Sequence, residues 1–287
     1  MTQPVVVVST RSFGSGEQDP QALLEAAGCR VELVAPSHDL AVIGDALRGA
    51  HGWIAGTAPV TAEHLAAAPA LRIVARYGVG VDAVDLRAAA ARGVVVTNTP
   101  GANAEAVADH TMALALAALR DVVAGDRAVR RRLVGFGCEV VAHDPYVREA
   151  DVPLVRLEEL VSSCDVVTLH LPGGGLPLVD AALLALFRPG AVLVNTARGD
   201  LLDEQAVARA LVEGRLGACA VDVLSAELGR GPSPLLDAPR VTVTPHVAGQ
   251  TVQAIDRMGM TAAAECVRVL VEGRPPQHPV QLQEAEQ

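Results

Sequence analysis

The chain has 287 residues, of which 51% are apolar and 2% aromatic, and its formal net charge is −10. This length allows two ordinary domains, each with a core of Val, Leu, Ala and Ile. The acidic balance argues against a protein that grips nucleic acid, and we find no basic stripe.

Cysteine usage and the N-terminus favour a cytoplasmic protein. The five cysteines are scattered without a C-x-x-C pair, a pattern typical of reduced thiols. The N-terminus lacks the basic and apolar regions of a signal peptide. The longest uncharged helical run, residues 111–119, is too short to cross a bilayer. We therefore expect neither export nor membrane insertion.

The first hundred residues alternate short apolar runs with Ala-rich helical stretches. We predict strands at residues 4–9, 30–35, 52–55, 71–76 and 94–98. The helices are predicted at residues 20–28, 39–48, 61–67 and 85–92. Strand–helix alternation at this spacing predicts a parallel sheet with helices on its faces.

A second alternating series follows a break at residues 97–101. A long helical pattern runs from residue 103 to about 120, and strands are then predicted at 138–143, 165–170, 191–195, 218–222 and 241–244. The last helix is predicted over residues 251–272 and ends at Gly273. The whole pattern predicts the α/β class.

Three charged side chains follow successive strands of this second series, namely Arg198, Glu227 and His246. The carboxyl ends of parallel strands meet at one edge, where ligands bind. A guanidinium can clamp a carboxylate, an imidazole can transfer a proton, and a carboxylate can orient that imidazole and favour its charged form. Taken singly, these residues are better explained as a surface arginine, a glutamate at the rim of the sheet and a histidine that caps a helix. Together they suit reduction of a 2-keto acid or oxidation of a 2-hydroxy acid.

Two further segments suggest ligand contacts. Residues 77–83 only superficially match G-x-G-x-x-A, and no acidic residue ends the following strand. We therefore interpret the turn as an amide cradle for an anionic substrate group, with a plain tight turn as the alternative. Asp144 ends a strand, where a Rossmann fold places the acid that binds the NAD ribose, although Asp before Pro145 is also a common turn former. No histidine spacing resembles a metal site.

Together these segments resemble the NAD-dependent D-2-hydroxyacid dehydrogenases, the family of phosphoglycerate and glyoxylate/hydroxypyruvate reductases. The likeness covers nearly the whole chain and is most specific at residues 78–85, 98–110, 143–146, 189–204, 221–227 and 244–249. It implies two doubly wound parallel-sheet domains. A flavodoxin-like substrate domain would comprise residues 1–98 plus 251–287, and a truncated Rossmann-like cofactor domain residues 99–250.

The resemblance also assigns roles in substrate binding and proton transfer. Arg198 would bind the substrate carboxylate, and His246 would act as general acid in reduction and as base in oxidation. Glu227 would orient and charge His246. The turn Tyr77-Gly78-Val79-Gly80 would bind the other end of the carboxylate through the amides of its last two residues.

The same resemblance implies NAD as cofactor and a second copy of the chain as partner. Asp144 would bind the ribose and favour NAD over NADP, and Thr196 and Asp222 would be further cofactor contacts. The long helix after Asn103 would build a homodimer. A small carboxylate is the implied substrate.

The chain departs from the family between residues 119 and 138. There the family has a strand, the G-x-G-x-x-G turn and a helix, whereas this chain has eighteen residues, 120–137. A βαβ unit needs about 30 residues or more, so the strand and the turn cannot fit. The missing strand would belong in the middle of the sheet. We therefore predict that strand 138–143 pairs directly beside 165–169 or 191–195, or that a partner chain fills the gap.

The departure leaves an alternative function open. A descendant without redox activity, such as a carboxylate-binding regulatory protein or a lyase or isomerase using His246, would keep the three charged residues and lose NAD. A fault in the sequence at the gap is a third explanation. We adopt the NAD-dependent dehydrogenase as the principal hypothesis.

Overall fold

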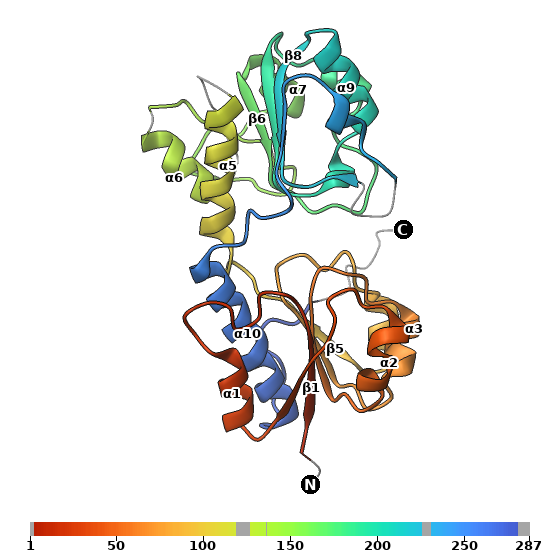
Figure 1. Ribbon diagram of the computed structural model, residues 1–287. Helices are drawn as coiled ribbons and strands as arrows, with labels where there is room; N and C mark the ends of the chain where they lie inside the picture. The colour runs from red at the N-terminus through yellow and green to blue at the C-terminus, as the bar shows by residue number, and fades with distance from the viewer. Residues whose placement is uncertain (1–2, 119–126, 136, 226–230, 281–287) are drawn as a thin grey trace. The chain divides into compact units, whose positions relative to one another are not determined.

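A computed structural model describes residues 3–118, 127–135, 137–225 and 231–280 (Figure 1). The chain divides into two compact units, residues 1–103 with 250–287 and residues 104–249. Each unit is built on a parallel sheet with helices on its faces, which confirms the α/β class. Residues 99–103, which were predicted to belong to the second domain, group with the first unit. The Thr99 amide donates to Gly78 O at the edge of the first sheet, which holds this segment there.

The first unit contains a five-stranded parallel sheet in the flavodoxin-like order β2-β1-β3-β4-β5. Its strands are β1 (Val5–Ser9), β2 (Arg30–Leu33), β3 (Gly52–Ala55), β4 (Ile73–Arg76) and β5 (Val95–Thr97). The central strands β1, β3 and β4 are buried along their whole length. This burial explains why they read in the sequence as continuous apolar runs and not as alternating ones.

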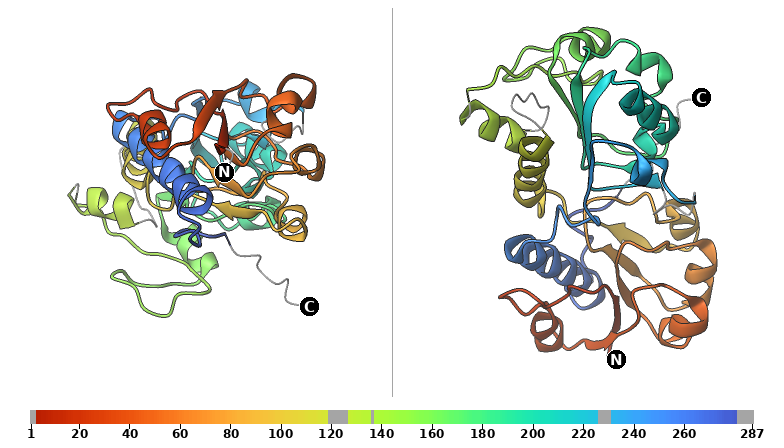
Figure 2. Two further views of the ribbon diagram at one scale, coloured as in Figure 1. Left: turned by 90° about the horizontal axis from the view of Figure 1, so that it is seen from below. Right: turned by 45° about the horizontal axis from the view of Figure 1, so that its top comes forward.

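Five helices cover the two faces of this sheet. They are α1 (Pro20–Ala26), α2 (Leu40–Arg48), α3 (Ala62–Ala67), α4 (Leu86–Ala91) and α10 (Val252–Leu270). The last of these lies beside α1 on one face, and α2 and α3 lie on the other (Figures 1 and 2). Capping side chains set several of the helix starts. Asp19, Asp85 and Thr251, for example, each accept a backbone N–H three residues later.

A buried polar chain crosses the core of the first unit at the end of β1. The Trp53 Nε1 donates to Ser9 Oγ, 2.7 Å away, and Ser9 Oγ lies 2.7 Å from His38 Nε2. The Nδ1 atom of His38 lies 3.0 Å from Pro59 O, an acceptor only. His38 therefore carries its proton on Nδ1, and its Nε2 accepts from Ser9. Every member of the chain is satisfied when His38 is neutral.

We predict that this network makes the first unit less stable in mild acid. Burial lowers the pKa of His38 below its usual value of 6.5, and the nearby His64 and Arg76 lower it further. Below pH 6.5 His38 binds a proton in the unfolded chain but stays neutral in the folded chain until the pH falls further. The free energy of unfolding is therefore highest above that pH and falls as pH drops towards the folded pKa. Thermal melts of wild type and His38→Gln from about pH 8 to about pH 5 measure the effect; equal pH slopes would contradict it.

The second unit contains a four-stranded parallel sheet in the order β6-β7-β8-β9 among the described residues. Its strands are β6 (Val166–Leu169), β7 (Ala191–Asn195), β8 (Leu216–Val221) and β9 (Val241–Val243). The register places Asn195, Val221 and Val243 in one row across the sheet. Three neighbouring strands therefore end at the same level.

Helices cover both faces of this second sheet as well. They are α5 (Ala104–Ala118), α6 (Arg127–Gly135), α7 (Leu157–Ser163), α8 (Ala181–Leu184) and α9 (Glu204–Val212), with short 3₁₀ turns η1 (Gly199–Leu201) and η3 (Pro234–Asp237). One face packs against α5 and α6, and the other against α7, α8 and α9 (Figure 1). Successive side chains of a strand point to opposite faces of the sheet. Val166 therefore packs on the face covered by α5 and α6, and Val167 on the face covered by α7, α8 and α9.

The predicted strand at residues 138–143 is not formed. Ala142 makes only an isolated bridge to Leu154, while Val140 and Val141 pack against the cores on opposite sides of the sheet. The predicted pairing with residues 165–169 or 191–195 is therefore wrong. No backbone hydrogen bond from the described residues reaches the outer edge of β6, so the segment leaves that edge of the sheet unpaired. That a partner chain completes this edge stays a prediction.

Candidate functional site

The carboxyl ends of β7, β8 and β9 bring several predicted residues to one edge of the second sheet. Arg198 follows β7 by three residues, Asp222 follows β8 directly, and His246 follows β9 by three. Because their strands are adjacent and end in one row, the loops that carry them start side by side. Glu227 lies outside the described residues.

A buried carboxylate holds the turn that carries His246. Asp222 is fully buried and accepts the amides of Val247 and Ala248, both at 2.9 Å, and the Thr244 hydroxyl at 2.5 Å. The His246 amide donates to the Asp222 carbonyl at 3.0 Å. His246 is exposed and has φ +55°, an unfavourable backbone conformation for a non-glycine residue. The carboxylate therefore maintains a strained turn that presents an imidazole to solvent.

The loop of Arg198 is fixed in a similar way. Buried Asn195 donates to the Arg198 carbonyl at 2.7 Å and accepts the Ala197 amide at 3.0 Å. Arg198 is half-buried, and its Nη1 donates to Ala197 O at 2.7 Å. These bonds fix the backbone on both sides of the arginine, which pre-orders a cation at the ligand edge.

A second buried carboxylate links the loop of Arg198 to the loop after β8. Glu204, 7% exposed, accepts the Ser225 amide at 2.7 Å, and the Ser225 hydroxyl donates to Gly199 O at 3.1 Å. A Cβ on Gly199 would lie 2.3 Å from the Leu224 carbonyl carbon. Only glycine therefore allows the two loops to approach this closely.

A third buried carboxylate holds the glycine-rich turn after β6. Asp200, 6% exposed, accepts the Gly174 amide at 2.7 Å. A Cβ on Gly173 would lie 2.3 Å from the Asp200 Oδ1 atom. Three loops at this edge are thus each fastened to a buried carboxylate, and such charge-assisted bonds are strong.

We predict that Gly173→Ala displaces this turn. The added methyl overlaps a buried carboxylate that already holds the neighbouring amide, and overpacking of this kind costs about 1–3 kcal/mol of unfolding free energy. Chemical denaturation measures the loss. Gly175→Ala is the matched control, because nothing lies within 4 Å of the Cβ position there. Equal destabilisation by the two variants would contradict the predicted clash.

The helix α5 contributes two residues that sequence reasoning missed. The Nε2 of His110 lies 2.9 Å from Thr244 Oγ1 and 3.4 Å from Asp222 Oδ1. Thr111 Oγ1 lies 2.9 Å from Thr196 Oγ1. The available signal was a polar pair at the start of an otherwise apolar run, at the end of the stretch 98–110 already noted for its family likeness.

The predicted amide cradle lies at the edge of the first sheet. Gly78 has φ +141°, and the carbonyl of Val79 accepts Asn98 Nδ2 at 2.8 Å. Among the described residues, the amides of Val79 and Gly80 have no hydrogen-bond acceptor. They are therefore available to an anion.

Tyr77, the first residue of this turn, has a buried side chain. It is 5% exposed, and its hydroxyl donates towards Ser12 O and Ile255 O, at 3.2 and 3.1 Å. Burial raises the pKa of this phenol. The side chain ties the loop after β1 to α10 within the core, and a substrate contact of Tyr77 stays a prediction.

The predicted cofactor residues occupy two kinds of environment. Asp144 is exposed, and one oxygen accepts the Tyr146 amide at 2.9 Å while the other has no donor in the described part of the chain. Thr196 and Asp222 are buried and bonded to protein groups. Asp144 can thus bind a ligand hydroxyl directly, whereas the side chains of Thr196 and Asp222 already hold neighbouring protein segments. Their contact with a cofactor stays a prediction.

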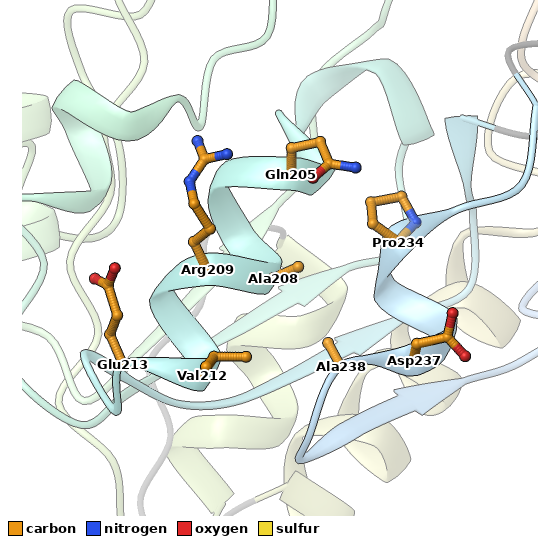
Figure 3. Close-up of a pocket in the computed structure, with 8 residues that line it drawn as sticks. All are labelled: Gln205, Ala208, Arg209, Val212, Glu213, Pro234, Asp237 and Ala238. Carbon is orange, nitrogen blue, oxygen red and sulfur yellow. The ribbon is translucent and has the colours of Figure 1, made fainter.

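A shallow groove elsewhere in the second unit is separate from these loops. Figure 3 shows it between α9 and η3, where Arg209 and Glu213 flank a floor that includes Ala208 and Val212. Neither Arg198 nor His246 lines it. Within the described ranges, no group of three His, Cys, Asp or Glu side chains is arranged to hold a metal ion, and no helix is long and apolar enough to cross a membrane.

Solved structures with the same architecture are known. A Thermus thermophilus protein, TT0316, superimposes with a TM-score of 0.87 at 32% identity, over 96% of this chain and 100% of that one. An NADPH-dependent glyoxylate/hydroxypyruvate reductase from Sinorhizobium meliloti, in complex with NADP and malonate, gives a TM-score of 0.82 at 27% identity, over 97% of each chain.

Curated relatives agree with these structures. D-3-phosphoglycerate dehydrogenase of Mycobacterium tuberculosis H37Rv is 39% identical over 75% of this chain and 48% of its own length. Glyoxylate reductase of Korarchaeum cryptofilum is 33% identical over 74% of this chain and 76% of its own. The chain thus spans about half the length of the phosphoglycerate dehydrogenase. Residues 113–248 match the model of the D-isomer specific 2-hydroxyacid dehydrogenase NAD binding domain. This chain therefore belongs to the D-isomer specific 2-hydroxyacid dehydrogenase family.

Proposed function

We propose that this protein is an NAD-dependent oxidoreductase that interconverts a small 2-keto acid and its D-2-hydroxy acid. The observation that carries the proposal is the pair of fixed loops at one edge of the second sheet, in which buried Asn195 holds the loop of Arg198 and buried Asp222 holds the turn of His246. Family membership favours this reading over the non-redox alternative. The relatives named above act on phosphoglycerate or glyoxylate by their names, which supports a small carboxylate substrate.

The charged side chains divide the chemistry between them. Arg198 binds the substrate carboxylate through its guanidinium. The amides of Val79 and Gly80, in the first unit, remain predicted donors to an anionic group. His246, protonated, gives its proton to the carbonyl oxygen as C2 is reduced, and takes the hydroxyl proton in the reverse direction. Glu227 orients the imidazole and favours its charged form. Orientation by fixed loops lowers the entropic cost of reaching the reactive geometry.

The residues present fit one part of NAD clearly. The exposed carboxylate of Asp144 suits the hydroxyls of the adenosine ribose and disfavours a 2′-phosphate, so we propose NAD over NADP. When bound, NADH supplies the hydride that C2 receives. Residues 120–137 contain no G-x-G-x-x-G sequence, and we propose that the diphosphate is held more weakly than in a complete Rossmann site.

A titration with NADH, followed by calorimetry, tests the proposal together with an assay of NADH oxidation on glyoxylate, hydroxypyruvate and pyruvate. We expect binding and turnover with at least one acid. Absence of NADH binding at millimolar concentration would overturn the redox function. Thermal stabilisation by the acids alone, without turnover, would favour the non-redox alternative.

We also propose a cell compartment and an oligomeric state for this protein. All five cysteines are free thiols and four are buried, which supports a reducing cytoplasmic compartment. A homodimer through the helix after Asn103 is supported by the family resemblance, and light scattering on the purified chain measures the mass that tests it.

A further inference from the structure

Two adjacent residues of α5 reach two different loops of the site. His110 contacts the turn after β9, and Thr111 contacts the loop after β7. One of these segments carries His246 and the other Arg198. The two strands are not neighbours, since β8 lies between them. A single helical segment therefore touches both candidate catalytic loops.

The bonds of Thr111 have a defined direction. Its hydroxyl donates to Val107 O at 2.7 Å, so its proton is already used within the helix. At 2.9 Å from Thr196 Oγ1, Thr111 Oγ1 must therefore accept the Thr196 proton. Both threonines are buried, and Thr196 precedes Arg198 by two residues. Thr111 thus fixes the backbone from which the guanidinium projects.

The bonds of His110 have a defined direction too. Both Asp222 carboxyl oxygens already accept backbone amides, so the 2.5 Å contact between Thr244 Oγ1 and Asp222 Oδ1 uses the Thr244 proton. His110 Nε2 must then donate to Thr244 Oγ1 at 2.9 Å. The buried Asp222 carboxylate lies 3.4 Å from the same nitrogen and also binds the amides on the far side of His246. His110 thus completes the set of bonds that holds the strained His246 turn.

We propose that His110 and Thr111 are positioning residues that separately set the proton-transferring His246 and the carboxylate-binding Arg198. The inference rests on the proposed function, because it assigns each residue to one step of that reaction. Neither side chain needs to touch the substrate. The charged groups near His110 are Asp222, across the helix–sheet contact, and Asp109 on its own helix, which is paired with Arg132.

The two halves of the pair predict different kinetic defects. Thr111→Val removes the acceptor for Thr196 and keeps the side-chain shape, so we expect KM for the 2-keto acid to rise about tenfold with kcat little changed. His110→Leu removes the donor to Thr244, so we expect kcat to fall about tenfold with KM little changed. The conservative variants Thr111→Ser and His110→Gln keep the required oxygen and N–H and should restore wild-type values.

Two measurements without turnover accompany the kinetics. Calorimetry with oxamate, a carboxylate analogue of the keto acid, should show weaker binding for Thr111→Val but not for His110→Leu. The NMR signals of the His246 ring should shift in His110→Leu and should return to their wild-type positions in His110→Gln. Thr242→Val in β9 and His51→Gln in the first unit are matched controls away from these contacts, and thermal melts establish that every variant is folded.

The outcomes separate the inference from the function on which it rests. If wild type neither binds oxamate nor reduces any keto acid, the proposed function fails. If wild type is active but Thr111→Val and His110→Leu match it, or if both of these variants raise KM and lower kcat alike without rescue, the positioning roles are wrong. The split defect with rescue supports them.

Discussion

Replacement of His246 by glutamine is expected to lower kcat by about 10²–10⁴-fold, the usual contribution of a positioned acid–base group. The imidazole is exposed on a turn that four hydrogen bonds to Asp222 keep in a left-handed conformation. Glutamine retains a polar side chain of similar reach but cannot donate and regain a proton near neutral pH. Steady-state kinetics in both directions, with NADH and NAD, measures the loss.

Arg198→Ala provides the contrasting control for that experiment. It removes a charged donor to the substrate carboxylate, and such hydrogen bonds contribute about 1.5–3 kcal/mol. KM for the keto acid should therefore rise by about one to two orders of magnitude, and calorimetry should show oxamate binding lost in Arg198→Ala but retained in His246→Gln. A kcat of the His246→Gln enzyme close to the wild-type value would contradict the acid–base role of His246.

Insertion of the segment that the chain lacks is expected to raise its affinity for NADH at least about tenfold. The insert would be a strand, a G-x-G-x-x-G turn and the start of the following helix, as in a complete Rossmann unit, placed between residues 119 and 127. The inserted strand would pair with the open outer edge of β6, and the turn would point backbone N–H groups at the diphosphate. Four more buried aliphatic side chains would add roughly 6–12 kcal/mol before the cost of ordering the chain.

The same insert with its glycines replaced by alanine is the control. This version keeps the strand and should raise the melting temperature as the first insert does, but it blocks close approach of the diphosphate and should leave NADH affinity unchanged. Calorimetry with NADH and thermal melts separate the two effects. Equal affinity of wild type and the intact insert would show that this chain already holds the diphosphate by other residues.

Local patterns in the sequence predicted most of the elements that carry the site. The strand at residues 191–195 was predicted with its observed bounds, and the strands around 218–222 and 241–244 within a few residues. Buried parallel strands read as short apolar runs, and helix caps such as Asp85 are chemically distinct, so both can be recognised locally. Because parallel strands end at one edge, the same reading placed Arg198 and His246 together.

What the sequence by itself determined, then, was the α/β class, the strand ends and the identity of the side chains on them. Only the tertiary structure decided which of those groups are bonded to each other. Asp222 is as plausible a ligand contact as Asp144 in the sequence, yet one is buried and holds a turn while the other is exposed. The segment 138–143 is apolar enough for a strand but formed none, and His110 reaches Thr244 from 134 residues away. Strand pairing and buried hydrogen bonds join residues distant in the chain, and local composition carries no information about which partner is within reach.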